Sequence, residues 1–184
     1  MAEPARKPMT ADEFLDWDDG TDTRHELVDS LVLAMAPTTD AHGTIAANAA
    51  LEINGRLDGR PPCRAIAEAG IRLDDGNHYE ADVAATCAEP RGGRYVEEPF
   101  LIVEVLSEST QDRDLGVKLQ RYLELPRLRE IWLIDSRKRW TQVWRRAGDA
   151  WIVGLPMRGS ASFASESLGG APVALDRLYR NTGL

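Results

Sequence analysis

The sequence predicts an α/β fold in which one mixed β-sheet is flanked by helices, with a short helix and a hairpin at the N-terminal end. One observation behind this prediction is the order of the periodic segments along the chain: helix, hairpin, helix, strands, helix, strands. A second is the length of 184 residues, which suits one well-packed domain. No internal repeat or linker divides the chain, so we expect residues 1–184 to form a single domain.

The N-terminal elements have local signals. Thr10 and Glu13 have the spacing of a capping box, which predicts the start of a short helix. Residues 24–35 contain two short apolar runs on either side of Asp29 and Ser30. This pattern predicts a tight β-hairpin, although no glycine is present to ease the turn.

Helical periodicity predicts two longer helices. Apolar residues recur at helical spacing over residues 42–57, and "DGRPP" ends that pattern. A second helix fits residues 112–125, whose apolar stripe would let it return over the sheet before Pro126 ends it. A last short helix is expected at about 175–179. Strands are expected at 63–73, 78–86 and 100–107, and in "REIWLID", "RWTQVWRR" and "AWIVGL".

The charge of the chain limits its partners. A net charge of −8 and a pI near 4.9 argue against a protein that binds nucleic acid through overall positive potential. They leave room for a local basic surface, because residues 137–146 hold five basic residues and two tryptophans. No apolar run reaches the roughly 18 residues of a membrane span, and the N-terminus lacks an apolar signal segment. We therefore expect a cytoplasmic protein with no membrane partner.

Two cysteines, Cys63 and Cys87, lie 24 residues apart without the spacing of a metal knuckle or a redox pair. We expect them to be buried free thiols.

Three acidic residues stand in apolar, strand-like surroundings: Glu26 in "HELV", Asp82 in "EADVAA" and Glu104 in "LIVEVLS". Glu26 could simply pair with Arg24 or His25, and Asp82 could cap a backbone group. Glu104 is harder to explain in this way, because an unpaired carboxylate in a buried strand would neutralise or destabilise the fold.

The spacing of these residues is compatible with a metal site. Asp82 and Glu104 come from consecutive strand candidates, so a short connection can bring both to one end of the sheet. Mg²⁺ takes oxygen ligands, commonly one or two carboxylates. Lys118, on the helix that doubles back, can lie beside Glu104 and could orient the attacking water or stabilise a pentacovalent phosphate. The alternative for Lys118 is a surface ion pair with Asp114 at i,i+4.

Several segments form a recognisable series across residues 9–155, among them "MTADEFLDW", "HELVDSLVLAMAP", "HGTIAANAAL", "EADVAA" and "VEVLSESTQDRDLGVKLQRYLE". In this order they resemble the Uma family of restriction endonucleases, a branch of the PD-(D/E)XK nuclease superfamily. The last segment is the most specific. The resemblance implies a restriction-endonuclease-like core and Mg²⁺-dependent cleavage of phosphodiesters, in which Mn²⁺ can take the place of Mg²⁺.

The resemblance also implies roles for individual residues. Asp82 takes the place of the first-motif Asp and Glu104 that of the acidic residue in the (D/E)XK element, and both would hold metal. Glu26 matches a hairpin Glu that resembles an additional metal or water ligand. The superfamily's lysine would fall at Leu106, so its role passes to Lys118 on the following helix.

The leading hypothesis is therefore a Mg²⁺-dependent endodeoxyribonuclease that acts as a homodimer, with DNA as its substrate. Two alternatives stay open: an inactive nuclease fold that serves as a nucleic-acid or protein interaction module, and a metal-dependent hydrolase of a small phosphorylated molecule. His42 could contact substrate or could merely cap or pack. Further candidates for phosphate contacts are Arg91, Arg94, Lys138, Arg139 and Arg145.

Overall fold

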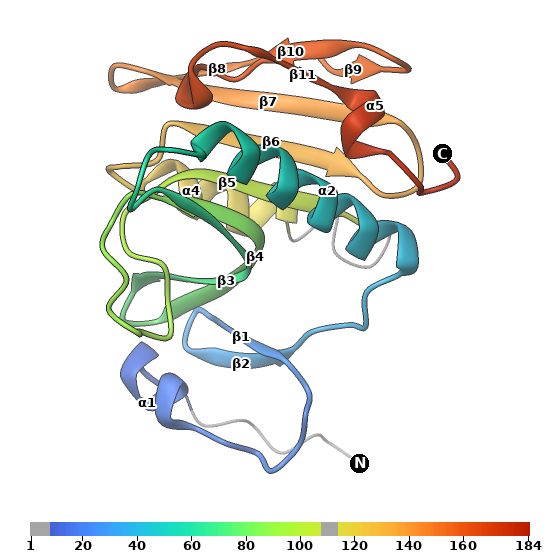
Figure 1. Cartoon of the computed structure of the whole chain (residues 1–184). Coiled ribbons are helices and arrows are strands. Elements are labelled where there is room, and N and C mark those ends of the chain that lie inside the picture. Colours follow the sequence, from blue (N-terminus) through green and yellow to red (C-terminus); the bar gives the residue numbers. More distant parts are fainter. Residues whose placement is uncertain (1–7, 108–113) are drawn as a thin grey trace.

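The computed structural model describes residues 8–107 and 114–184, and it confirms a mixed sheet flanked by helices (Figure 1). The helices are α1 (Ala11–Asp16), α2 (Asp40–Leu57), the π-helix η1 (Asp114–Lys118), α4 (Leu119–Leu123), the 3₁₀-helix η2 (Glu166–Leu168) and α5 (Leu175–Leu178). The strands are β1 (His25–Val28), β2 (Leu31–Ala34), β3 (Arg64–Asp74), β4 (Asn77–Thr86), β5 (Pro99–Leu106), β6 (Glu130–Asp135), β7 (Trp140–Ala147), β8 (Ala150–Val153), β9 (Met157–Arg158), β10 (Ser162–Ala164) and β11 (Pro172–Ala174).

The main sheet has the order β2-β1-β4-β5-β6-β7-β8, with β3 paired to β4 and β9 to β7. Strands β5 and β6 are parallel, and the other pairs are antiparallel. The parallel pair follows from the chain between them, which crosses over one face of the sheet through η1 and α4. That crossover carries Lys118 back toward β5.

Strand β4 changes partner along one of its edges. Its pairing with β3 runs from the Arg64–Thr86 end to the Asp74–Asn77 end. The opposite edge pairs with β1 at His78 and with β5 from Val83 onward. Residues 79–82 therefore lie where β1 gives way to β5, and this junction can hold side chains from three strands.

Two apolar clusters lie on the two faces of the sheet. Helices α2 and α5 cover one face, where side chains such as Ile53 and Leu178 pack on alternate residues of β5 and β6, including Val103 and Trp132. The other face carries Ile102, Leu106 and the residues of α4. Alternation along β5 therefore turns Glu104 toward the α4 face, between the two apolar residues Ile102 and Leu106.

The predicted hairpin is β1–β2, and Asp29 and Ser30 form its turn with φ of 47° and 66°. Both values lie in the left-handed region that a two-residue primed turn requires. Two contacts to the next hairpin support them: Asp29 N donates to Asn77 Oδ1 (3.0 Å), and Ser30 N donates to Gly76 O (2.8 Å). Tertiary hydrogen bonds thus replace the missing glycine.

The predicted second helix is a π-helix that continues as α4, rather than one regular α-helix from 112 to 125. The sequence predicts Ser107, Ser109 and Thr110 as caps of this helix, and Ser109 and Thr110 lie outside the described residues. The strands β9, β10 and β11 were not predicted, because each has only two or three residues.

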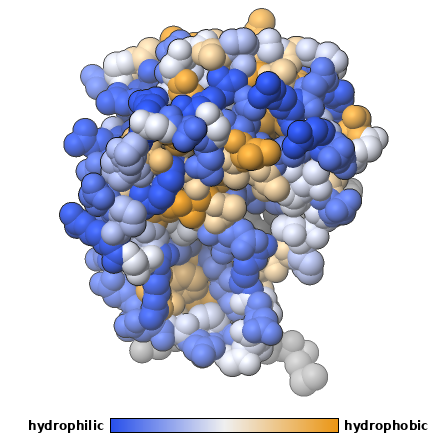
Figure 2. All heavy atoms as spheres, viewed as in Figure 1, coloured by the Kyte–Doolittle hydropathy of each residue, from blue (hydrophilic) through white to orange (hydrophobic). Residues whose placement is uncertain are grey.

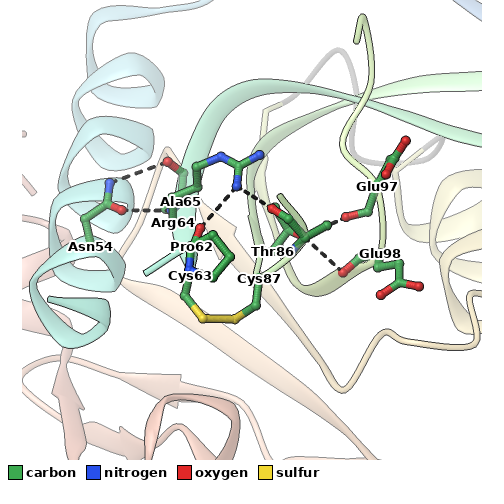
Figure 3. The surroundings of a disulfide bond; sticks show 10 residues. Asn54, Pro62, Cys63, Arg64, Ala65, Thr86, Cys87, Glu97 and Glu98 are labelled. Atoms are coloured by element: carbon green, nitrogen blue, oxygen red, sulfur yellow. Dashed lines mark hydrogen bonds between the residues drawn. A yellow bond between two sulfur atoms is a disulfide. The ribbon is translucent and has the colours of Figure 1, made fainter. Parts of the chain in front are cut away.

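The prediction of free cysteines is wrong: Cys63 and Cys87 form a disulfide (Figure 3). Arg64 and Thr86 are the last pair of the β3–β4 ladder, so the next residue on each strand faces the other directly. The β3–β4 hairpin brings the two cysteines together although they are 24 residues apart in the sequence.

Hydrophilic side chains cover most of the face shown in Figure 2. In the part of the chain that the structure describes, no helix has the length and apolarity to cross a membrane.

Candidate functional site

Asp82 and Glu104 are neighbours across two antiparallel strands. The pairing of Val83 with Val103 places Asp82 of β4 opposite Glu104 of β5. Residues directly opposite in an antiparallel pair project from the same face, so the two carboxyl groups lie next to each other. The backbone N–H of Val105 donates to Asp82 Oδ2 at 2.6 Å.

Glu104 is almost fully buried, with 2% of its surface exposed. Its Oε1 atom accepts a hydrogen bond from the hydroxyl of Tyr122 (2.7 Å) and lies 3.1 Å from the Nζ atom of Lys118. The apolar strand therefore accommodates a carboxylate because a cation and a hydroxyl meet it inside the protein.

Lys118 lies among acidic and carbonyl oxygens rather than on the surface. Its Nζ atom is 2.9 Å from Glu26 Oε1 and donates to the backbone oxygen of Glu80 at 2.9 Å. Only 4% of its side chain is exposed, so Lys118 does not lie on the surface. The pair with Asp114 stays a prediction, because the side chain of Asp114 is outside the part that the structure describes. Lys118 is the last residue of the π-helix η1, in the crossover from β5 to β6.

Glu26 joins the site from β1. The backbone N–H of Glu80 donates to its Oε1 atom at 3.0 Å, which ties β1 to β4 at the junction. The predicted alternative partners are occupied elsewhere: Arg24 pairs with Glu68 and Glu80, and His25 with Asp19.

His42 approaches the site from the opposite face of the sheet. It lies in the first turn of α2, where its backbone N–H donates to the Thr39 side chain. Its Nε2 atom is 3.4 Å from Asp82 Oδ1. The Nδ1 atom is buried and has no hydrogen-bond partner among the described residues. Asp82 is thus contacted by His42 on one side and by β5 on the other.

Burial raises the pKa of Asp82 above its ordinary value, while His42, the Val105 N–H and Lys118 act in the opposite direction. Burial outweighs these contacts because it disfavours the charged form of the carboxyl group.

Within residues 8–107 and 114–184, no group of three or more His, Cys, Asp and Glu side chains is arranged to hold a metal ion. The pair of Asp82 and Glu104 nevertheless fits Mg²⁺, which binds through one or two carboxylates and keeps several waters. The Asp82 side chain is 20% exposed, so the pair is open to solvent on its side. Glu26 is connected to this pair through Lys118, whose Nζ atom lies within 3.1 Å of both Glu26 and Glu104.

The sequence did not single out Tyr122, which was expected only as part of an apolar stripe. A signal was available: Tyr122 lies four residues after Lys118, and side chains at that spacing share a helix face. Leu106, at the superfamily's lysine position, is 1% exposed and part of the core.

The further basic candidates have acidic or backbone partners elsewhere. The pairs are Arg91 with Glu97, Arg94 with Asp16, Lys138 with Asp135, Arg139 with Asp176 and Arg145 with Glu130 and the Ala164 carbonyl.

Comparison with known proteins supports a nuclease fold. The model of the Uma2 family, described as "Putative restriction endonuclease", matches residues 11–166. An uncharacterized protein of Synechocystis sp., slr1290, is 27% identical over 177 residues, which cover 94% of this chain and 92% of that protein. The crystal structure of a "putative nuclease belonging to DUF820" from Anabaena variabilis is similar with a TM-score of 0.75 at 18% identity, covering 94% of this chain and 98% of that one.

Proposed function

The chain belongs to the Uma2 family of restriction-endonuclease-like proteins, and from this premise we propose that it is a metal-dependent nuclease that hydrolyses phosphodiester bonds of DNA. The observation that carries the proposal is the placement of Asp82 opposite Glu104 on the neighbouring strands β4 and β5, with the Lys118 ammonium 3.1 Å from Glu104. Two carboxylates that can bind a metal ion, with an ammonium group beside them, suit the hydrolysis of a phosphodiester.

Asp82 and Glu104 would hold the ion, Mg²⁺ or Mn²⁺. When bound there, it lowers the pKa of a coordinated water and neutralises charge on the scissile phosphate. The chain around it fixes the ligands: the Val105 N–H and His42 hold Asp82, and Tyr122 and Lys118 hold Glu104. Such support keeps ligand oxygens oriented before the ion arrives.

Lys118 supplies the positive charge that the usual strand lysine provides in the superfamily. In this proposal its ammonium orients the attacking water or stabilises the negative charge of the pentacovalent phosphate. Glu26 keeps that ammonium charged and aimed at the carboxylate pair, since it contacts Nζ at 2.9 Å. Glu26 therefore acts in this proposal as a positioning residue for Lys118, rather than as the further metal ligand that the family resemblance implies.

The acidic chain can act on a polyanion because the bound cation reverses the field at the site. Cleavage of both strands of a duplex needs two such sites, which we propose a two-fold homodimer supplies. Light scattering of the purified protein tests this: a monomer with and without DNA would contradict it.

The test of the function is cleavage of supercoiled plasmid DNA with Mg²⁺ or Mn²⁺. We expect nicking by the wild-type protein and none by Asp82→Asn or Glu104→Gln, two isosteric changes that remove the ligand charge. Glu124→Gln, which changes an exposed carboxylate on the same crossover, is the matched control and should cleave normally. Mn²⁺ affinity, measured by calorimetry, should be lost in the two site variants and kept in the control.

Other outcomes discriminate the alternatives. Binding of Mn²⁺ without cleavage of DNA or RNA would favour hydrolysis of a small phosphorylated molecule. No Mn²⁺ binding would favour an interaction module, for which the burial of Leu106 at the lysine position is the structural argument.

A further inference from the structure

A second concave site lies at the end of the sheet where β4 ends and β5 begins. Its volume is about 440 Å³, and its charged lining residues are Arg60, Arg127, Arg129 and Glu98. Cys87 and Phe100 also line it. Phe100 precedes Glu104 by four residues on β5, about 13 Å at the rise of an extended strand. The pocket is thus separate from the carboxylate pair.

The charge of this pocket is opposite to that of the whole chain. Three guanidinium groups face one carboxylate, in a protein with a net charge of −8. The one ion pair, from Arg127 Nε to Glu98 Oε1, is 3.8 Å long, and both side chains are more than 60% exposed. The side chains of Arg60 and Arg129 form no ion pair or hydrogen bond with any other part of the chain that the structure describes. Two cations are therefore available to a ligand.

The backbone under these two arginines is held firmly. Arg129 N donates to Phe100 O, and Arg129 O accepts from Arg146 N, both at 2.8 Å, so Arg129 is fixed between β5 and β7. Arg60 lies in the turn after α2, in which Arg60 N donates to Leu57 O (2.9 Å) and Cys63 N to Arg60 O (2.8 Å).

The disulfide connects this turn to the pocket wall. Cys63 ends the turn that contains Arg60, and its disulfide partner Cys87 lines the pocket. Figure 3 shows the disulfide. Beside Cys87, Thr86 donates to the backbone oxygens of Glu97 and Glu98. The disulfide and the strand pairing therefore fix the distance between the backbones of Arg60 and Arg129. Their side chains stay free to close on a ligand.

We propose that Arg60, Arg127 and Arg129 bind a backbone phosphate of the nucleic acid, away from the point of cleavage. The guanidinium fork matches phosphate oxygens with two parallel hydrogen bonds, and arginine loses less hydration than lysine when it binds. The 13 Å along β5 correspond to about four nucleotide steps at 3.4 Å per step. The identity of the ligand rests on the nuclease function proposed above; the anion site itself does not.

The test is binding of a fluorescent DNA duplex, measured by anisotropy in EDTA so that no cleavage occurs, over a series of salt concentrations. The variant is Arg60→Gln/Arg129→Gln, and the matched control is Arg158→Gln/Arg180→Gln, which removes the same charge from two exposed arginines elsewhere. Loss of this phosphate contact should weaken binding about tenfold and reduce the slope of log K against log salt by about one. The control should keep the wild-type slope.

Equal behaviour of the variant and the control would overturn the proposal. Inorganic phosphate and a mononucleotide serve as competitors. If inorganic phosphate displaces the DNA only at concentrations far above those at which an unlabelled oligonucleotide does, the site binds a nucleic-acid strand. If the two competitors act at equal concentrations, the site binds a free anion, and this result would also overturn the proposal. The nuclease function is tested separately. If the arginine variant cleaves plasmid DNA and binds DNA as the wild type does, only the phosphate site is refuted. If DNA binding depends on the arginines but the wild-type protein does not cleave DNA, only the nuclease function is refuted.

Discussion

The Nζ atom of Lys118 lies 3.1 Å from Glu104 Oε1, although the two residues come from different elements, the π-helix η1 and the strand β5. In the pattern that the chain resembles, the lysine follows the acid by two residues on the same strand. Here that position is the core residue Leu106. The crossover between the parallel strands β5 and β6 returns the cation to the place that the strand no longer supplies.

Replacement of Lys118 by Met should lower the rate of DNA cleavage by about 100-fold or more, the cost of removing a charge that stabilises a transition state. Mn²⁺ affinity should not fall, because the change removes a cation next to the ligand Glu104. Lys138→Met, at an exposed lysine, is the control. A cleavage rate within a few-fold of the wild type would remove Lys118 from the mechanism.

Glu26→Gln tests whether Glu26 positions Lys118 or binds metal itself. If it positions Lys118 through the contact of 2.9 Å, cleavage should slow by about tenfold while Mn²⁺ affinity stays near the wild-type value. Calorimetry and plasmid nicking on the same preparation separate the two roles. A large loss of Mn²⁺ affinity would identify Glu26 as a ligand.

His42→Asn should weaken Mn²⁺ binding by about tenfold, because the imidazole Nε2 atom orients the Asp82 carboxyl at 3.4 Å. His78→Asn provides a matched control, because His78 is also 7% exposed and its Nε2 has no hydrogen-bond partner within residues 8–107 and 114–184. Unlike His42, it packs beside Phe14, with ring centroids 5.4 Å apart. The control should lose stability and keep Mn²⁺ affinity. Equal effects of both changes on metal binding would argue that His42 has only a structural role.

Glu52 should make the stability of the fold depend on acid pH. Burial alone would raise its pKa, but hydrogen bonds from Arg56 and Arg177 outweigh burial and hold the pKa below the ordinary value of 4.5. The unfolded chain therefore binds a proton more readily than the folded one. The stabilisation is present above the ordinary pKa and is lost as the pH falls through the lowered one.

The change Glu52→Gln should accordingly cost about 1 to 3 kcal/mol of unfolding free energy at pH 7 and progressively less toward acid pH. Urea unfolding at several pH values measures this. A difference between wild type and variant that is constant from pH 7 to strongly acid conditions would contradict the assignment.

Loss of the disulfide should destabilise the fold without disrupting the candidate metal site. The link closes a loop with a sequence separation of 24, for which chain entropy gives about 3 kcal/mol. Cys63→Ser/Cys87→Ser should lower the unfolding free energy by that amount and retain Mn²⁺ binding. Two reactive thiols in the native wild-type protein, titrated without reductant, would show instead that the link is not formed.

The sequence by itself determined the order of elements and the set of acidic residues, because both depend on local information. The helical period of apolar residues in α2 and the apolar run of β5 are local patterns, and Glu104 was conspicuous because a charge in an apolar strand needs a partner. Its pairing with Asp82 required only that β4 and β5 be neighbours.

Tertiary structure decided the rest, because distant segments supply the partners. Lys118 can lie on the surface or be buried beside Glu104, depending on where the crossover returns to the sheet. Helical spacing alone does not show where that is. The primed turn at Ser30 relies on Gly76, and the disulfide relies on the register of β3 against β4, which no spacing of two cysteines reveals. Burial sets the free-energy cost of leaving a charged or polar group such as Lys118 without a partner, and a side chain becomes buried only when the sheet and its helices have assembled.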